Sequence, residues 1–193
     1  MKWEESLRKQ ATSLSYTIDY LMLNGQMEKV IQAISTTKGI VYFTGVGKNM
    51  YTAARVSDTY QSLGIRSLFI DPVNSLHGGM GVFSPIDTVV AISKSGETEE
   101  LIKFLTVLSR RDFENIIAIS SSESSSLARL AKFSLIVPVR DEGDHLGLAP
   151  ISSTMIYGAV LDSIAVEISS ERGYSRLDFI ENHPGGELGK TRG

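Results

Sequence analysis

The sequence predicts an α/β protein, a three-layer α/β/α sandwich around a five-stranded parallel sheet. Two observations predict this class. Short apolar, β-branched runs alternate with segments whose apolar residues recur at helical spacing. The runs at 40–44 and 88–93 are apolar on both faces, as expected for strands buried in a parallel sheet. In such sheets ligands bind beyond the carboxyl ends of the strands, where the strand order reverses.

Each element follows from its own pattern. Apolar residues recur at helical spacing from Trp3 to Leu21, and a second short helix is expected over about Met27–Ser35. The expected strands are Ile40–Thr44, Ser67–Ile70, Thr88–Ser93, Ile116–Ser120 and Ser134–Val139. The helices expected between them are Asn49–Leu63, Glu97–Arg110 and Ser126–Lys132. A last helix, about Ser152–Arg172, is apolar on more than one stripe, so it is expected to contact both the sheet and a partner chain. The tail 182–189 is too rich in glycine for regular structure.

Composition excludes several classes of function. A chain of 193 residues is long enough for one core and too short for two comfortable domains. The net charge of −3 offers no basic surplus for nucleic acid or an anionic membrane. The absence of cysteine excludes disulfides and thiolate metal sites. The N-terminus carries acids and lacks a signal-like apolar region, and no apolar run approaches membrane-spanning length, so a cytoplasmic protein is expected.

The segment Ser93–Thr98, here called the serine loop, is the most informative part of the chain. It follows an apolar strand and precedes a helix. The hydroxyls of Ser93, Ser95 and Thr98 can donate hydrogen bonds, and Gly96 lets the backbone approach a ligand closely. The first N–H groups of the following helix carry partial positive charge. The loop is therefore expected to bind the phosphate of a small metabolite.

A glycine loop, Gly45–Lys48, follows the first strand and is expected to reach the same edge. It lacks P-loop spacing, and Met50 stands where a dinucleotide fingerprint needs its third glycine, so neither nucleotide site is favoured. Gly45 and Gly47 would let Lys48 direct its charge over the pocket. The helix dipole disfavours a cation at the N-terminus of a helix, which argues against a merely solvated lysine.

Three hydroxyls in a row, Ser152, Ser153 and Thr154, open the last helix. They are either helix caps or a second set of phosphate donors, and the sequence leaves both readings open. Glu97, Glu99 and Glu100 lie in the first turn after the serine loop, where they complement the helix dipole or one of them faces the sugar, and the spacing does not say which. Glu142, in an acidic loop, is either solvated or functional.

The histidines show no metal-ligand spacing, and no metal site is expected. His77 precedes a glycine pair, and His183 precedes Pro184 and two glycines, so both lie in loops able to approach a ligand. A loop histidine can act as acid or base near neutral pH.

Taken together, these segments resemble the sugar isomerase (SIS) domain, a flavodoxin-like fold, and most closely the arabinose-5-phosphate isomerase family. The resembling stretches are Thr44–Lys48, Leu76–Gly78, Ile92–Gly96, Leu148–Thr154 and His183–Lys190. The resemblance implies one SIS domain over 1–193: N-terminal helices to about 36, a sheet core over about 39–172, and an active-site tail over about 173–193.

The resemblance also implies roles for single residues. The catalytic residues would be Lys48, Glu100, Glu142 and His183, and in similar proteins the tail histidine serves a neighbouring subunit of a tetramer. The phosphate-binding residues would be Ser93, Ser95, Thr98, Ser152, Ser153 and Thr154, and Gly45, Gly47, His77 and Gly96 would also meet the substrate.

The chain departs from the family pattern at three points. It has Gly143-Asp144-His145 where Ala-Cys-Pro is usual, Ile151 where threonine is common, and no CBS modules after the SIS segment. The first two leave the exact sugar open.

The expected activity is isomerisation of ribulose 5-phosphate to arabinose 5-phosphate through an enediol, without metal or organic cofactor, in a homotetramer or homodimer. The alternatives are a non-catalytic sugar-phosphate sensor and a hexulose-phosphate isomerase.

Overall fold

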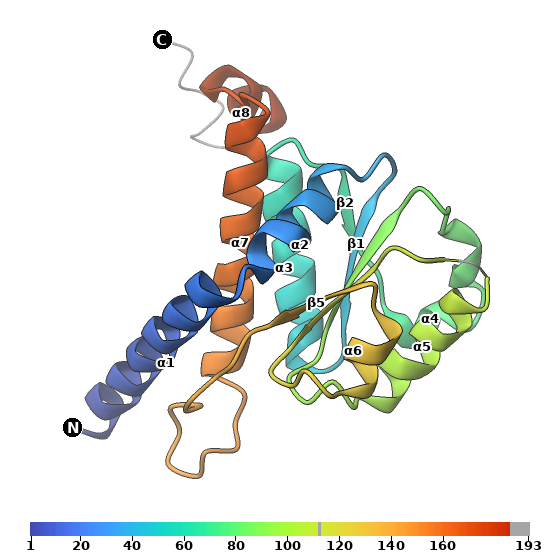
Figure 1. Cartoon of the computed structure of the whole chain (residues 1–193). Coiled ribbons are helices and arrows are strands. Elements are labelled where there is room, and N and C mark those ends of the chain that lie inside the picture. The colour runs from blue at the N-terminus through green and yellow to red at the C-terminus, as the bar shows by residue number, and fades with distance from the viewer. Residues whose placement is uncertain (112, 186–193) are drawn as a thin grey trace.

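A computed structural model describes residues 1–111 and 113–185 of the chain. Its centre is one sheet of five parallel strands in the order β2-β1-β3-β4-β5 (Figure 1). The strands are β1 (Val41–Gly45), β2 (Ser67–Phe69), β3 (Thr88–Ile92), β4 (Ile116–Ser120) and β5 (Phe133–Ile136). The predicted five-stranded parallel sheet is confirmed.

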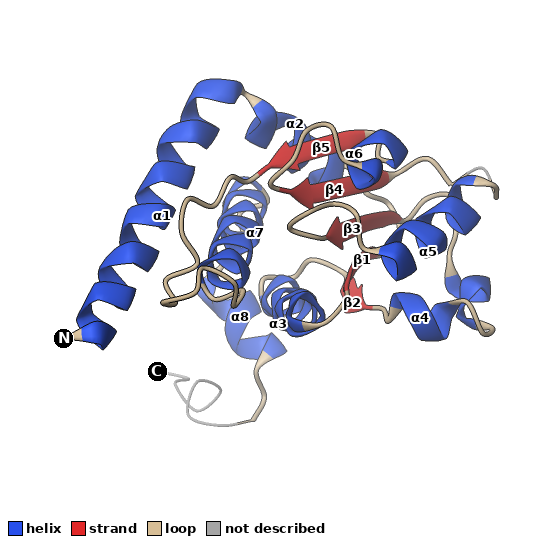
Figure 2. Cartoon of the chain, turned by 90° about the horizontal axis from the view of Figure 1, so that it is seen from below, coloured by secondary structure: helices blue, strands red, loops and turns tan. Residues whose placement is uncertain are grey.

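Helices cover both faces of the sheet, which gives the predicted three layers (Figure 2). One face carries α2 (Gln26–Ser35), α3 (Lys48–Ser62) and α7 (Ser152–Glu171). The other carries α4 (Pro72–Ser75), the short 3₁₀ turn η1 (Gly79–Val82), α5 (Glu99–Ser109) and α6 (Ser126–Leu130). Two further helices, α1 (Lys2–Asn24) and α8 (Arg176–Asn182), extend from the two ends of this body.

Successive side chains of each strand point to opposite faces of the sheet, which divides the core between the two faces. Every residue of β1, β3 and β4 is buried, because helices cover both sides of these strands. In β1, Phe43 packs edge-on against Tyr60 of α3 with ring centroids 4.7 Å apart, whereas Tyr42 packs against Phe83 on the opposite face. The Tyr60 hydroxyl donates to the Leu161 carbonyl at 3.0 Å, which ties α3 to α7.

Helix α1 contributes little to this core. Its buried residues are Ser13, Thr17 and Leu21, whereas Trp3 is 59% exposed. The Ser13 hydroxyl donates to the Asp141 carbonyl and accepts from the Asp141 N–H, both at 2.9 Å. Helix α1 therefore supports the segment that leads into Glu142.

The structure differs from the sequence-based boundaries at several places. Helix α5 begins at Glu99, two residues after the predicted start, because the left-handed backbone of Gly96 extends the preceding loop. Strand β5 ends at Ile136 rather than Val139, because Pro138 has no N–H to continue the ladder. The short helices α4 and α8 were not predicted, and the predicted irregular tail lies outside the described residues from 186 onward.

Candidate active site

The glycine loop and the serine loop share one edge of the sheet. They follow β1 and β3, which are parallel neighbours paired over their whole length. β2 lies beyond β1, and β4 and β5 lie beyond β3, so the strand order reverses between these two strands. This is the place in a parallel sheet where ligands bind.

The serine loop is tightly hydrogen-bonded within itself. The buried Ser93 hydroxyl lies 2.9 Å from the Thr98 hydroxyl and accepts from the Gly96 N–H at 3.1 Å. Gly96 has a φ of 68°, and a Cβ at this position would lie 2.3 Å from Ser125 Oγ. Glycine is required here both by the backbone conformation and by the close approach.

The N-terminus of α5 opens at this loop. Within the described chain, no side chain caps the first turn of α5. The exposed Ser95 lies beside it and accepts from the Glu97 N–H at 3.1 Å. The Glu97 carboxylate accepts from the Ser126 N–H at 2.8 Å, and this bond lowers the pKa of Glu97. The uncapped N–H groups and the Ser95 hydroxyl are therefore donors that an anion can use.

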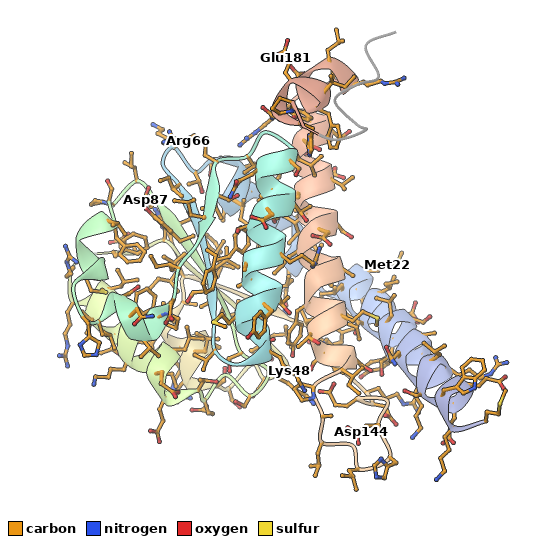
Figure 3. All side chains as sticks on the ribbon, turned by 180° about the vertical axis from the view of Figure 1, so that it is seen from behind. Met22, Lys48, Arg66, Asp87, Asp144 and Glu181 are labelled. Carbon is orange, nitrogen blue, oxygen red and sulfur yellow. The ribbon has the colours of Figure 1, made fainter. Side chains whose placement is uncertain are left out.

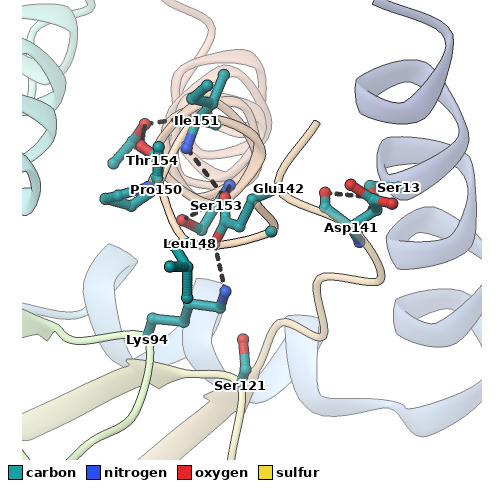
Figure 4. Close-up of polar contacts among 12 residues, drawn as sticks. Ser13, Lys94, Ser121, Asp141, Glu142, Leu148, Pro150, Ile151, Ser153 and Thr154 are labelled. Atoms are coloured by element: carbon teal, nitrogen blue, oxygen red, sulfur yellow. Dashed lines mark hydrogen bonds and ion pairs between the residues drawn. The ribbon is translucent and has the colours of Figure 1, made fainter. Parts of the chain in front are cut away.

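Glu142 lies at the start of α7 and is only 3% exposed. Its Oε2 atom accepts from the N–H groups of Ile151 and Ser153 at 2.9 and 3.0 Å (Figure 4). The Ser153 hydroxyl donates to the same oxygen at 3.1 Å. The Glu142 carboxylate thus supplies the negative charge that the N-terminus of a helix favours.

The second carboxylate oxygen of Glu142, Oε1, accepts from Nζ of Lys94 in the serine loop. Burial by itself raises the pKa of Glu142. The hydrogen bonds and charge of Lys94 and the two donors of Ser153 outweigh burial, so this pKa lies below its usual value. The result is a buried, ionised carboxylate joined to the serine loop by an ion pair.

The three hydroxyls at the start of α7 have different surroundings. Ser153 donates to Glu142, and Thr154 Oγ1 donates to the Pro150 carbonyl at 3.1 Å. The buried Ser152 hydroxyl has no hydrogen-bond partner among residues 1–111 and 113–185. In this structure the Ser153 donors serve Glu142, and phosphate binding by this trio stays a prediction.

Lys48 is the first residue of α3 and is exposed. It lines a groove of about 390 Å³ together with Thr154, at the start of α7. Gly45 lets the first turn of α3 pack close to the end of β1, because a Cβ at Gly45 would lie 2.9 Å from the backbone of that turn. Gly47 has a φ of 62°, a left-handed conformation that favours glycine. Figure 3 shows Lys48 at the same end of the molecule as Asp144.

Glu100 and His77 lie at the surface. Glu100 is exposed in the first turn of α5, and His77 is exposed in the turn after α4, where its N–H donates to the Asn74 carbonyl at 3.0 Å. Within the described chain, neither side chain bonds to Lys48 or Glu142. Their predicted roles therefore depend on contacts with a ligand.

His183 lies far from the other predicted catalytic residues of the same chain. It ends α8, where its ring stacks on Phe179 with centroids 3.9 Å apart and Nδ1 lies 2.7 Å from the Phe179 carbonyl. Figure 1 shows α8 at the opposite end of α7 from the loop that contains Glu142. Helix α7 has 20 residues and is therefore about 30 Å long. One chain alone does not bring His183 to Glu142.

The loop that follows Glu142 is organised by Asp144. Its carboxylate accepts from four consecutive backbone N–H groups, those of Leu146, Gly147, Leu148 and Ala149, at 2.5–3.0 Å. Desolvation raises the pKa of Asp144, but these four donors outweigh it and hold the pKa below its usual value. The residue that departs from the resembled family thus has a structural role in this chain.

Two features are absent from the described chain. Among residues 1–111 and 113–185, no three His, Asp or Glu side chains gather closely enough to hold a metal ion. No helix in the same part of the chain combines the length and the apolar character needed to cross a membrane.

Comparison with known proteins identifies the fold family. The model of the SIS domain matches residues 34–167, which include the sheet, the serine loop and most of α7. The chain belongs to the SIS domain family.

Two relatives of this SIS domain are named as arabinose 5-phosphate isomerases. Arabinose 5-phosphate isomerase KpsF of Escherichia coli O6:H1 is 35% identical over 187 residues, which are 96% of this chain and 56% of that protein. Arabinose 5-phosphate isomerase KdsD of Escherichia coli K12 is 39% identical over 153 residues, which are 79% of this chain and 46% of that protein. The chain spans about half the length of these relatives.

A solved structure supports the same relationship. A protein of Escherichia coli CFT073, determined in complex with arabinose 5-phosphate, aligns with a TM-score of 0.82 and 31% identity. The alignment covers 92% of this SIS domain and 95% of that chain. The similarity thus extends well beyond the residues of the SIS family model.

Lys94 is the residue at this site that the sequence analysis missed. It stands between two serines that were predicted to bind phosphate, and that position was the available signal. Its partner Glu142 is 48 residues away, so the ion pair has no local pattern in the sequence. With Lys94 included, the SIS domain presents anion donors, an ionised carboxylate and two lysines at one edge of the sheet.

Proposed function

We propose that this SIS domain catalyses the aldose–ketose isomerisation of a sugar phosphate. The conversion of D-ribulose 5-phosphate to D-arabinose 5-phosphate is the first choice. The observation that carries the proposal is the ion pair between the serine loop and Glu142. It joins the serine loop, for which we propose phosphate binding, to a buried carboxylate. The names of the relatives, arabinose 5-phosphate isomerases, support an isomerase of a sugar phosphate.

Substrate binding would begin at the phosphate. The open N-terminus of α5 and the exposed Ser95 offer donors to a dianion without a metal ion. Binding energy released at the phosphate would fix the carbon chain over the start of α7. A phosphate held there leaves C1 and C2 free to meet the acid–base groups.

Glu142 would be the base of the reaction. It would take a proton from C1 of the ketose, a double bond would form between C1 and C2, and the carbonyl oxygen would gain negative charge. The O1 hydroxyl would pass its proton to the oxygen on C2, and return of the first proton to C2 would then leave a carbonyl at C1, which is the aldose. Both oxygens of Glu142 are hydrogen-bonded in this structure, and Oε1, which accepts from Lys94, would turn its second lone pair toward C1 of the substrate.

Lys48 and Glu100 would assist this transfer. The ammonium of Lys48, at the groove beside α7, would stabilise the enediolate oxygen. Glu100, in the first turn of α5, would orient a sugar hydroxyl. Both roles come from the resemblance, and both side chains are exposed and able to turn toward a ligand.

His183 would act from a second copy of the chain, because it lies at the far end of α7 from Glu142 of its own chain. A homo-oligomer is therefore part of the proposal. The apolar side chains exposed on α1, Trp3 and Leu7 among them, would be covered in such an assembly. The cytoplasmic location expected from the sequence is kept as a prediction.

The test is to incubate the purified protein with ribulose 5-phosphate in deuterated water. An aldose 5-phosphate of arabinose configuration with deuterium at C2 is the expected product. Absence of both exchange and product at high enzyme concentration would contradict the proposal. Conversion of a six-carbon ketose phosphate only would favour the hexulose-phosphate isomerase instead.

A sugar-phosphate sensor is the second candidate, and one observation favours it. Glu142 Oε2 accepts from the N–H groups of Ile151 and Ser153 and from the Ser153 hydroxyl, as a carboxylate that served only to cap α7 would. A sensor would bind arabinose 5-phosphate without exchanging its C2 hydrogen. Calorimetric binding without turnover would therefore favour the sensor.

A further inference from the structure

One ion pair connects the two halves of the proposed site. Lys94 belongs to the loop after β3, and Glu142 belongs to the segment before α7. The Lys94 side chain is 42% exposed, and the Glu142 side chain is 2% exposed. Lys94 therefore reaches from the solvent side of the serine loop to a buried carboxylate (Figure 4).

Both partners are anchored independently of each other. The Lys94 carbonyl accepts from the Ser121 N–H at 3.0 Å, so the backbone of Lys94 is held against the loop after β4. The other oxygen of Glu142 is held by Ile151 and Ser153. The backbone of Lys94 and the carboxylate of Glu142 are thus each held by hydrogen bonds that do not depend on their ion pair.

Other charged groups lie around this pair, and among the described residues none of them bonds to Glu142. A cavity of about 330 Å³ beside the pair is also lined by Lys9, Arg140, Asp141, Asp144 and His145. Lys9 pairs with Asp141 at 3.5 Å, and Asp144 binds the backbone of its own loop. The nearby Tyr157 hydroxyl, on α7, bonds to Ser121 Oγ at 2.7 Å. Of these groups, Lys94 is the one whose charge contacts Glu142 within the described chain.

We propose that Lys94 is a positioning residue for this site: it fixes the Glu142 carboxylate at the start of α7 and so places the base at a set distance from the ligand on the serine loop. This inference rests on the proposed function. It assigns a role to a side chain that lies between two predicted phosphate ligands.

The proposal has a consequence for protonation. If Lys94 is removed, the buried Glu142 charge loses its contacting cation, and the carboxyl group should gain a proton at higher pH. The reaction needs the ionised carboxylate, so as the pH is lowered the activity should be lost at a higher pH than in the wild type. Arginine at the same position should preserve the charge and much of the effect.

The experiment compares Lys94→Met, Lys94→Arg and the control Lys103→Met, which replaces an exposed lysine of α5. The acid limb of kcat/KM should move up by about one pH unit or more in Lys94→Met. We expect it to stay near the wild-type position in Lys94→Arg and in the control. An unchanged limb in Lys94→Met would overturn the proposal.

A second measurement works whether or not the protein is an isomerase. The Glu142 carboxyl carbon, labelled with ¹³C and assigned with Glu142→Gln, should titrate at higher pH in Lys94→Met than in the wild type. An equal titration in both would overturn the positioning role even for an inactive protein. If Lys94→Met does not fold, Lys94→Met combined with Glu142→Gln should fold, because the pair is then removed together; failure of the double variant as well would contradict the proposal.

Discussion

At the residue scale, Glu142 decides between an enzyme and a sensor. Glu142→Gln keeps the size of the side chain and removes its charge. We expect this variant to bind arabinose 5-phosphate and to lose about 10²–10⁴-fold in kcat, the range for general acid–base catalysis. Deuterium exchange at C2 measures the loss, and Glu167→Gln, an exposed site on α7, is the matched control. A kcat close to wild type would remove Glu142 from the base role.

The depressed pKa of Glu142 also predicts how stability depends on pH. A carboxyl group whose pKa is lower in the folded state stabilises that state above its unfolded pKa, which is about 4.3. This stability is lost as the pH falls through the folded pKa. Urea unfolding between pH 7 and pH 3 should therefore show a steeper loss for the wild type than for Glu142→Gln. Parallel loss in both proteins would contradict the lowered pKa.

Gly96 offers a prediction of stability with an internal control. Gly96→Ala should destabilise the protein by about 2–4 kcal/mol, because the backbone there is left-handed and the new Cβ would meet Ser125. Gly147→Ala is the matched control, since Gly147 has a φ of 67° but open space around its Cβ position. Denaturant unfolding of both separates the steric effect from the backbone effect. Equal losses in the two variants would show that the contact with Ser125 does not matter.

At the element scale, Asp144 should determine the order of the loop after Glu142. Asp144→Ala removes the acceptor of four backbone N–H groups, so the amides of 146–149 should exchange with solvent about tenfold faster or more. The wild-type protection should also fade as the pH falls through the lowered pKa of Asp144. Asp58→Ala, at an exposed site on α3, is the control. Unchanged exchange in Asp144→Ala would contradict this role.

The same scale shows which parts of the structure were readable in the sequence. β1, β3 and β4 were predicted because burial on both faces leaves a continuous apolar run. The start of α5 was misplaced, because helical spacing does not register that Gly96 and the bonds of Ser95 and Glu97 extend the loop.

The site was partly readable for a related reason. Hydroxyls, glycines and lysines next to strand ends are local signals, and they pointed to the sheet edge where the structure brings the glycine loop and the serine loop together. The ion pair of Lys94 with Glu142 is a contact between segments far apart in the chain, so no local pattern shows it. The four bonds of Asp144 to its own loop are local but depend on a backbone path that composition does not reveal.

At the scale of the whole molecule, one chain places Glu142 and His183 at opposite ends of α7. The exposed apolar residues of α1 and α7, including Trp3 and Val166, give surfaces on which a second copy can pack. A site assembled from two chains reconciles the predicted role of His183 with its position. Symmetric assembly would then repeat the site in each chain.

This arrangement predicts complementation between inactive variants. Glu142→Gln and His183→Ala should each be nearly inactive alone. When equal amounts are unfolded and refolded together, a mixed dimer contains one site with Glu142 from one chain and His183 from the other. Random pairing makes half of the dimers mixed, each with one intact site of two, so about a quarter of wild-type activity should return. If both residues act within one chain, every site carries one substitution, and the mixture should be as inactive as its components.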